Sequence, residues 1–226
     1  TTEAPPGVTV TTGPVTNLPP DFIIADQITN TTDNHQLVLF IVTPYTRKAH
    51  NDDEKCTGVA DTAYIRVEPT ARLIITPDAD TLCNEQFVNI QVTIPSVSTN
   101  GVRYKFRVEV PTGVDVDPIP FYDLSSGVPI IDSISNTTLN AQQVLFIISP
   151  YTWDNNDIEK CPGKIDTAII WINPTPVITV SLPPVRPYDT LFCNDYPVDF
   201  SVDTENGFII GDKVYDITVV PDPDIS

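Results

Sequence analysis

The sequence predicts an all-β protein, and three observations lead to this prediction. Thr, Val and Ile are abundant, and these residues fit the half-buried, pleated surface of a strand. The 226 residues include 23 prolines, about twice the usual share of ~5%, and proline punctuates loops and strand ends. Short apolar and alternating stretches recur between turn residues, and no long stretch has the 3.6-residue period of a helix.

One long stretch of the sequence occurs twice. Residues 28–46 match residues 134–152, which lie 106 positions later, with 13 identities in 19. One residue is then lost, and the pattern Glu-Lys-Cys-x-Gly-x-x-Asp-Thr-Ala recurs from Glu54 and from Glu159. A repeat of this length is the size of a domain. About seven strands per repeat are typical of an immunoglobulin-like fold, so we expect tandem immunoglobulin-like β-sandwiches of about 106 residues.

The register of the repeat divides the chain into one complete unit and two parts. We expect residues 1–70 to be the C-terminal half of one repeat, 71–176 a complete repeat, and 177–226 the N-terminal half of a third. Each half would expose an apolar face if it stood alone. Either the natural chain continues at both ends, or halves of different molecules complement each other by strand exchange.

The repeated apolar run predicts the central strand of each unit. Residues 37–43 carry no charge, so both faces of this strand should be covered, and Pro44 and Pro150 should end the two copies. Residues 22–24 and 128–131 predict short strands that precede the run.

Strands with one solvated face should follow. Ala63, Ile65 and Val67 alternate with polar or exposed positions, as do their copies in 168–172. Pro69 and Pro174 then mark turns or junctions, because proline cannot donate to a sheet. Further strands are expected at 72–76, 88–93 and 102–111, with counterparts at 177–181, 198–202 and 213–221.

The four cysteines, two in each period, allow three pairings. If the chain folds back at each proline turn, Cys56 faces Cys83 and Cys161 faces Cys193, and each disulfide would add roughly 3 kcal/mol. If the proline segments are straight junctions, each cysteine lies at one end of its own sandwich and pairs with a neighbouring domain. No CxxC pair or companion His has the spacing of a zinc site.

The charge and the polar residues exclude several classes of function. The net charge of 12 − 30 = −18 argues against nucleic acid and against anionic membranes as partners, and no stretch is apolar enough to insert in a membrane. The repeat replaces His35 by Ala141 and provides no counterpart of His50, so a catalytic set in every unit is excluded and we expect no enzymatic activity. We expect no cofactor, although the acidic loops 51–54 and 154–157 and residues 78–80 could hold calcium.

Three weaker patterns remain in the sequence. Tyr45, Tyr151, Trp153 and Trp171 could form a sugar-stacking surface or simply cover the core. Asn30-Thr31-Thr32 and its copy at 136–138 match the N-glycosylation triplet. An Asp-Thr or Asp-Ser pair followed by an apolar residue occurs five times, and such a pair is typical of a turn that leads into a strand.

The motifs Val-Thr-Pro-Tyr, Cys-x-Gly, Asp-Thr-Ala-x-Ile-x-Val-x-Pro-Thr and Thr-Leu-Cys-Asn carry a resemblance over essentially the whole chain. The chain resembles the PKD-like (immunoglobulin-like) repeats of giant Bacteroidetes cell-surface adhesins, of the gliding-motility type carried by type IX secretion. The resemblance implies a bacterial outer-surface location and O-glycosylation at the Asp-Thr and Asp-Ser pairs. The candidate sites are Thr62, Thr81, Ser133, Thr167 and Thr190, with Thr81 and Thr190 favoured because they lie nearer loops.

These observations favour a structural and adhesive segment of a long extracellular filament or stalk. Its expected partners are neighbouring repeats of the same chain, with surface polysaccharide or other surface proteins as further candidates. A carbohydrate- or calcium-dependent binding module is the first alternative, and an accessory segment of a secreted enzyme is the second. Binding modules would bind polysaccharide or gain thermal stability with calcium, and a stalk would do neither.

Overall fold

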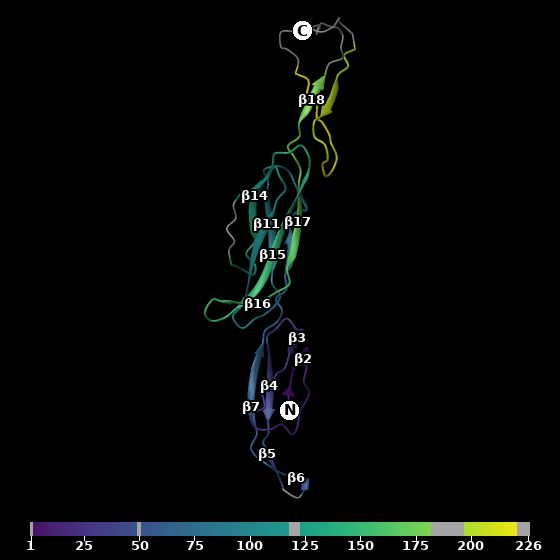
Figure 1. The fold of residues 1–226 in the computed structure, drawn as a ribbon. Coiled ribbons are helices and arrows are strands. Elements are labelled where there is room, and N and C mark those ends of the chain that lie inside the picture. The colour runs from purple at the N-terminus through teal and green to yellow at the C-terminus, as the bar shows by residue number, and fades with distance from the viewer. Residues whose placement is uncertain (1, 49–50, 118–122, 182–196, 221–226) are drawn as a thin grey trace.

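The computed structural model describes residues 2–48, 51–117, 123–181 and 197–220. These residues form strands and no helix, which confirms the all-β prediction. We use three names for the parts of the chain: the N-terminal segment (1–70), the central segment (71–176) and the C-terminal segment (177–226). Figure 1 shows them following one another along an elongated molecule, with β4 and β7 in one part, β11, β15 and β17 in the next, and β18 beyond them.

The central segment contains two sheets packed face to face, the arrangement of a β-sandwich. One sheet has the order β12-β14-β10-β8, and the other has the order β13-β11-β15-β17-β9, with β16 paired to β15. Neighbouring strands are antiparallel except β9, which runs parallel to β17. The strands are β8 (Ile74–Pro77), β9 (Thr81–Leu82), β10 (Phe87–Thr93), β11 (Val102–Glu109), β12 (Val114–Val116), β13 (Leu124–Ser125), β14 (Ile130–Asn136), β15 (Gln142–Trp153), β16 (Glu159–Pro162) and β17 (Asp166–Ile172).

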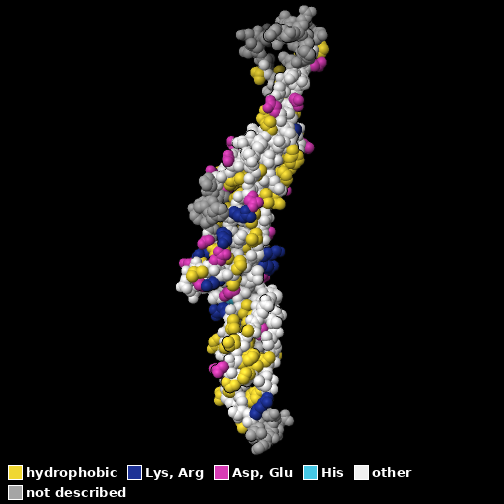
Figure 2. Space-filling model, viewed as in Figure 1, with side chains coloured by type: hydrophobic (Ala, Val, Ile, Leu, Met, Phe, Trp, Pro, Cys, Tyr) yellow, Lys and Arg dark blue, Asp and Glu magenta, His cyan; other side chains and the backbone are white. Residues whose placement is uncertain are grey.

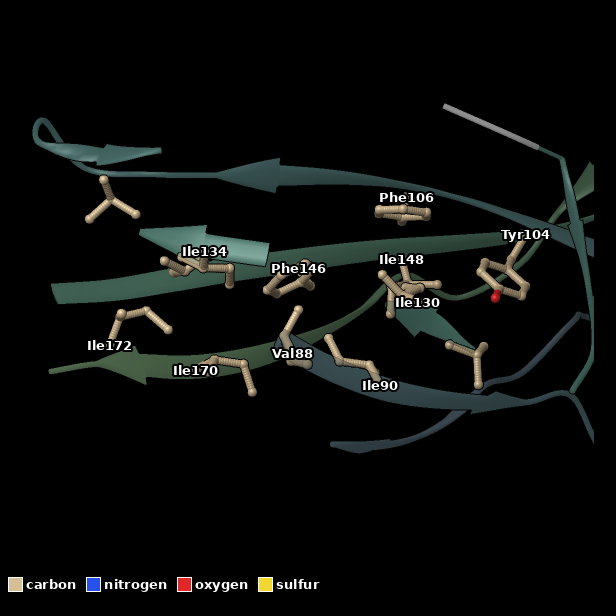
Figure 3. Close-up of a cluster of buried hydrophobic side chains, with 14 of the residues drawn as sticks. Val88, Ile90, Tyr104, Phe106, Ile130, Ile134, Phe146, Ile148, Ile170 and Ile172 are labelled. Atoms are coloured by element: carbon tan, nitrogen blue, oxygen red, sulfur yellow. The ribbon is translucent and has the colours of Figure 1, made fainter. Parts of the chain in front are cut away.

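The core of the central segment lies between the two sheets. Strand alternation sends every second side chain inward, so Ile170 and Ile172 are fully buried while Ile169, just before Ile170, is exposed. Tyr104 and Phe106 of β11 point inward in the same way. Figure 3 shows them together with apolar side chains from both sheets.

The prediction that Pro150 ends its strand was wrong. β15 continues through Pro150 to Trp153, and Tyr104 of β11 lies opposite this proline. Pro150 has no N–H to donate, but its carbonyl accepts a hydrogen bond from Gly163 N–H at 2.8 Å, so the strand keeps a partner on that side. The matching position in the N-terminal segment behaves as predicted, because β4 ends at Val42, before Pro44.

The N-terminal segment repeats half of this pairing pattern. Its three sheets are β1-β4-β7, β2-β3 and β5-β6. Phe40 lies opposite Ala63 as Phe146 lies opposite Ala168, and Glu3 lies opposite Leu39 as Glu109 lies opposite Leu145. The strands are β1 (Thr2–Glu3), β2 (Val8–Val10), β3 (Ile28–Asn30), β4 (Gln36–Val42), β5 (Tyr45–Lys48), β6 (Asn51–Thr57) and β7 (Asp61–Val67).

Two predicted strands do not form, and both lack a partner strand. Residues 22–24 are not a strand. In the central segment Ile130, the counterpart of Ile24, pairs with Ile90 of β10. The described residues of the N-terminal segment contain no counterpart of β10. Residues 213–220, the described part of the strand predicted at 213–221, are likewise without strand structure.

The C-terminal segment contributes one antiparallel pair, β18 (Ile178–Ser181) and β19 (Ser201–Thr204). Val180 lies opposite Val202, as Ile75 lies opposite Val92 in the pair β8-β10 of the central segment. The first two strand predictions of this segment, 177–181 and 198–202, therefore correspond to strands whose limits differ by at most three residues.

Candidate functional site: the two polar junctions

The N-terminal and central segments are joined by backbone hydrogen bonds. Val97 N–H donates to the Asp33 carbonyl at 2.6 Å, and His35 N–H donates to the Val97 carbonyl at 3.0 Å. The two chain pieces form a short parallel bridge at Asn34 and Val97. The loop between β10 and β11 is therefore hydrogen-bonded to the turn that precedes β4.

Charged side chains reinforce this first junction. The Arg72 guanidinium donates to both carboxylate oxygens of Asp33, with Nε at 2.8 Å from Oδ1. The hydrogen bond from Arg72 holds the pKa of Asp33 below its usual range. Glu68, just before Pro69, accepts hydrogen bonds from the Thr99 N–H at 3.1 Å and from the Thr99 hydroxyl. Burial raises the pKa of Glu68, but the hydrogen bonds from Thr99 and Ser98 outweigh it, so the net pKa is lowered.

The second junction has the same plan with different side chains. Gly207 N–H donates to the Leu139 carbonyl at 3.0 Å, and Ala141 N–H donates to the Phe208 carbonyl at 2.6 Å. Asn173 stands where Glu68 stands in the first junction. Its amide both donates to the Ile210 carbonyl and accepts from Ile210 N–H, each at 2.9 Å. Each junction therefore combines a backbone bridge with a polar side chain from the end of the preceding strand.

A buried asparagine supports the turn beside each junction. Asn136 is 2% exposed, and its amide donates to the Asn140 and Ile172 carbonyls, both at 2.8 Å. Its Oδ1 accepts from the N–H and hydroxyl of Thr138. Asn30 makes the matching bonds to the Asn34 and Val67 carbonyls. The Asn-Thr-Thr triplets therefore serve as structural turns, since the amide nitrogen that a glycan would need is buried and occupied.

The Cys-x-Gly motif brings β16 and the following loop against the start of the central segment. Gly163 N–H bonds to the Pro150 carbonyl, and Lys164 N–H donates to the Ala71 carbonyl at 3.0 Å. A Cβ on Gly163 would collide with the Ala71 carbonyl and would lie 2.7 Å from Pro150 Cγ. Gly58 makes the equivalent bond to Pro44, at 2.8 Å. Glycine is thus required where the loop passes close to another backbone.

The described cysteines form no disulfide with one another, and the straight-junction pairing with a neighbouring domain stays a prediction. Cys56, Cys83 and Cys161 are free and exposed, so the fold-back pairing Cys56–Cys83 is not formed, and Cys193 lies outside the described residues. The chain does not fold back at Pro69, because β7 leads through the junction into β8 of the next segment. Cys161 lies on β16, two residues before Gly163, whose loop passes close to Ala71. Cys83 directly follows β9, and the next residue, Asn84, donates a hydrogen bond from its side chain to the Thr175 hydroxyl at 2.8 Å.

The candidate glycosylation residues share a local geometry. At Thr62, Ser133 and Thr167 the backbone N–H donates to Oδ1 of the preceding aspartate, at 2.7–2.9 Å. Thr62 and Thr167 are exposed near the starts of β7 and β17, whereas Ser133 and Thr81 are half-buried. Thr190 lies outside the described residues. Accessibility therefore favours Thr62 and Thr167 over Thr81, which the sequence reasoning had placed first.

Asp132 is an unusual member of this group because its side chain is buried. The residue is 6% exposed, and its Oδ2 has no hydrogen-bond partner. Burial is the largest cause, and it raises the pKa of Asp132 to about 6. The charge of Asp117 also raises this pKa, whereas the hydrogen bond from the Ser133 N–H lowers it. This carboxyl lies between Ile130 and Ile134 on the inward face of β14, where an ionised oxygen is poorly solvated.

Several of the acidic and aromatic residues that the sequence singled out contact other groups of the protein. Asp154 accepts from the Asn156 and Ile158 N–H groups and pairs with Lys160 at 3.1 Å, and the two N–H groups lower its pKa. No cluster of three metal-binding side chains exists among the residues that the structure describes. Arg103 lies over the Trp153 ring, and Trp171 packs edge-on against Phe208 at the second junction, 5.7 Å between ring centres.

Comparison with known proteins leaves the family open. No protein-family model matches the chain, and no curated protein matches it at a significant level. In the described part of the chain, no helix is long and apolar enough to cross a membrane. Sequence reasoning missed the junction residues Asp33, Glu68 and Arg72. The recurrence of Asn30 and Asn34 as Asn136 and Asn140 was the available signal, because both asparagines bracket a junction turn.

Proposed function

We propose that this chain is a non-enzymatic structural and adhesive segment of a long extracellular surface filament or stalk, built from tandem immunoglobulin-like (PKD-like) repeats. The observation that carries the proposal is the pair of polar junctions. A filament transmits force and position only if successive units keep a fixed orientation, and backbone bridges at both junctions favour a fixed orientation. The same plan at two successive junctions is what a repeated structural unit requires.

The resemblance to gliding-motility adhesins supplies the finer part of this proposal. It places the filament on the outer surface of a bacterium, exported by type IX secretion, with neighbouring repeats as its main partners and surface polysaccharide or surface proteins as further ones. The exposed Thr62 and Thr167 are then the first candidates for O-glycans. A net charge of −18 would help to keep such a long chain soluble.

The proposal is tested on intact cells that produce the protein. Antibodies raised against the recombinant chain should label extended structures outside unpermeabilised cells, as seen by immunogold electron microscopy. Labelling only after permeabilisation would contradict a surface filament. Peptide mass spectrometry of the native protein is the companion measurement, and it should find hexose-type additions on the peptides that contain Thr62 and Thr167. Unmodified peptides would remove the glycosylation part of the proposal.

A further inference from the structure

In the central segment, a strand from the beginning of the chain path pairs in parallel with the strand that ends it. β9 follows β8, the first strand of the segment, and β17 is the last strand. Trp171 lies opposite Thr81, and Ile172 lies opposite Leu82. The pair therefore bonds the beginning of the segment directly to its end.

Two backbone hydrogen bonds hold this parallel pair together. Trp171 N–H donates to the Asp80 carbonyl, and Asn173 N–H donates to the Leu82 carbonyl, each at 2.8 Å. Leu82 also packs against the core of the segment, and Ile172 is part of that core. Bonds between neighbouring strands run across the strands, so a force along the strands acts on both bonds at once.

A side-chain bond lies just beyond the two backbone bonds. The Asn84 amide donates to the Thr175 hydroxyl at 2.8 Å. The Asn84 Oδ1 accepts from Asn136 N–H at 2.6 Å, which fixes the side chain to the end of β14. The residues that follow β9 are therefore also bonded to the residues that follow β17.

The two polar junctions determine how tension would enter this pair. They lie at opposite ends of the central segment (Figure 1). Figure 2 shows the side chains of the central segment spanning the width of the molecule between the other two segments, so tension along the chain passes through it. From the first junction, Arg72 leads through β8 to the start of β9, and from the end of β17 Asn173 leads into the second junction.

This path pulls β9 from its first residue and β17 from its last. In a parallel pair these two ends point in opposite directions, so tension slides the strands past each other. The hydrogen bonds between them must then break together. If both strands were pulled from the same end, the bonds would open one after another and each would resist alone.

We propose that the pairing of β9 with β17 is a clamp that resists stretching of the central segment along the chain. Its resistance depends on direction, because it is high against sliding and low against peeling. The clamp is a property of the fold and does not require the proposed location on the cell surface. A filament under tension is the setting in which it would matter.

Stretching single molecules of the 226-residue chain in two directions is the direct test. Both experiments use a Cys56→Ser, Cys161→Ser, Cys193→Ser protein in optical tweezers. In the first, handles on terminal tags pull the two chain ends, and unfolding of the 106 residues of the central segment lengthens the chain by roughly 300–350 Å. In the second, handles on Cys83 and on the C-terminal tag pull β9 and β17 from the same end. The central segment should unfold at a higher force in the first direction, at equal pulling speed.

Substitutions on β17 test the hydrogen bond itself. Trp171→Pro removes the N–H that bonds to Asp80 and keeps the bonds to β15, because alternate residues of β17 face its two neighbours. The unfolding rate at constant force along the chain should rise about fivefold or more. Ile169→Pro is the matched control, since its N–H faces the same edge but lies outside the two positions that pair with β9. Trp171→Ala keeps the N–H and measures the loss of the packing on Phe208 alone.

The outcomes separate the clamp from general stability. Equal unfolding forces in the two directions would overturn the proposal. So would an Ile169→Pro or Trp171→Ala protein that unfolds as fast under force as Trp171→Pro. Circular dichroism shows whether each variant is folded, and if Trp171→Pro does not fold, the two pulling directions still decide. Failure of the clamp would leave the surface-filament proposal standing, because immunogold labelling does not depend on it.

Discussion

The N-terminal segment repeats half of the strand pairs of the central segment in the same register, but the two segments differ in what covers these strands. Phe146 opposite Ala168 and Phe40 opposite Ala63 are equivalent pairs, and both sheets form. In the central segment the second sheet buries the inward side chains of β15 and β17, whereas in the N-terminal segment Val38 is buried but Ile65 and Val42 are about half exposed. The comparison teaches that hairpin pairing is local to each half of the repeat, whereas burial depends on strands from the other half.

The largest expected difference between the two segments is in the cost of removing an inward side chain. Ile170→Ala should destabilise the central segment by about 2–5 kcal/mol, because it leaves a cavity in a closed core. Ile65→Ala, at the matching position, should cost less than about 1 kcal/mol because the side chain is already half solvated. Urea denaturation with hydrogen exchange on peptides of β7 and β17 measures both, at concentrations where the chain is monomeric. Equal losses at the two sites would break the comparison.

The next difference concerns the two glycines that follow the repeated cysteines. Gly163→Ala should cost about 1–3 kcal/mol, because its Cβ would displace Ala71 and break the bond from Lys164 N–H. Gly58→Ala meets only Pro44, with its Cβ 3.0 Å from Cγ, and should cost less. Thermal melting of the two variants gives the comparison. If the two variants melt at the same temperature, the close approach to Ala71 is not what selects glycine.

A pH-dependent effect comes from Asp132, whose carboxyl is buried in the closed core. Its folded pKa of about 6 lies above the ordinary 3.8, so the folded state binds the proton more tightly and loses stability as pH rises from about 4 through 6. Asp132→Asn should remove this loss and stabilise the chain by about 2 kcal/mol at pH 7.5, and by much less at pH 4. Urea denaturation of both proteins at the two pH values tests this. A pH-independent difference would show that the carboxyl is not the cause.

The sequence was sufficient for features that depend on local periodicity. Alternation identified the inward residues of β17, and the repeated apolar run identified β4 and β15. It failed at residues 22–24 and 213–220, where apolar residues lack a partner strand within the described chain. It also failed at Pro150, because the carbonyl of a proline can still accept a ladder hydrogen bond from Gly163.

The junctions could not be predicted from the sequence because their bonds join residues far apart in the chain. Arg72 reaches Asp33, and Glu68 reaches Thr99, at separations of 39 and 31 residues. Nor does the second junction use the same side chains, since Asn173 replaces Glu68 and binds backbone groups at Ile210. Only the geometry of the backbone is shared, and no residue pattern encodes it directly.

If the polar junctions act as proposed, they fix the orientation of one segment relative to the next. Spin labels at Thr62 and Thr93, both exposed, in a chain whose four cysteines are replaced by serine, would report this through double electron–electron resonance. We expect a narrow distance distribution that broadens when Glu68 and Arg72 are both replaced by alanine. A broad distribution in the unmodified junction, unchanged by the two substitutions, would contradict it.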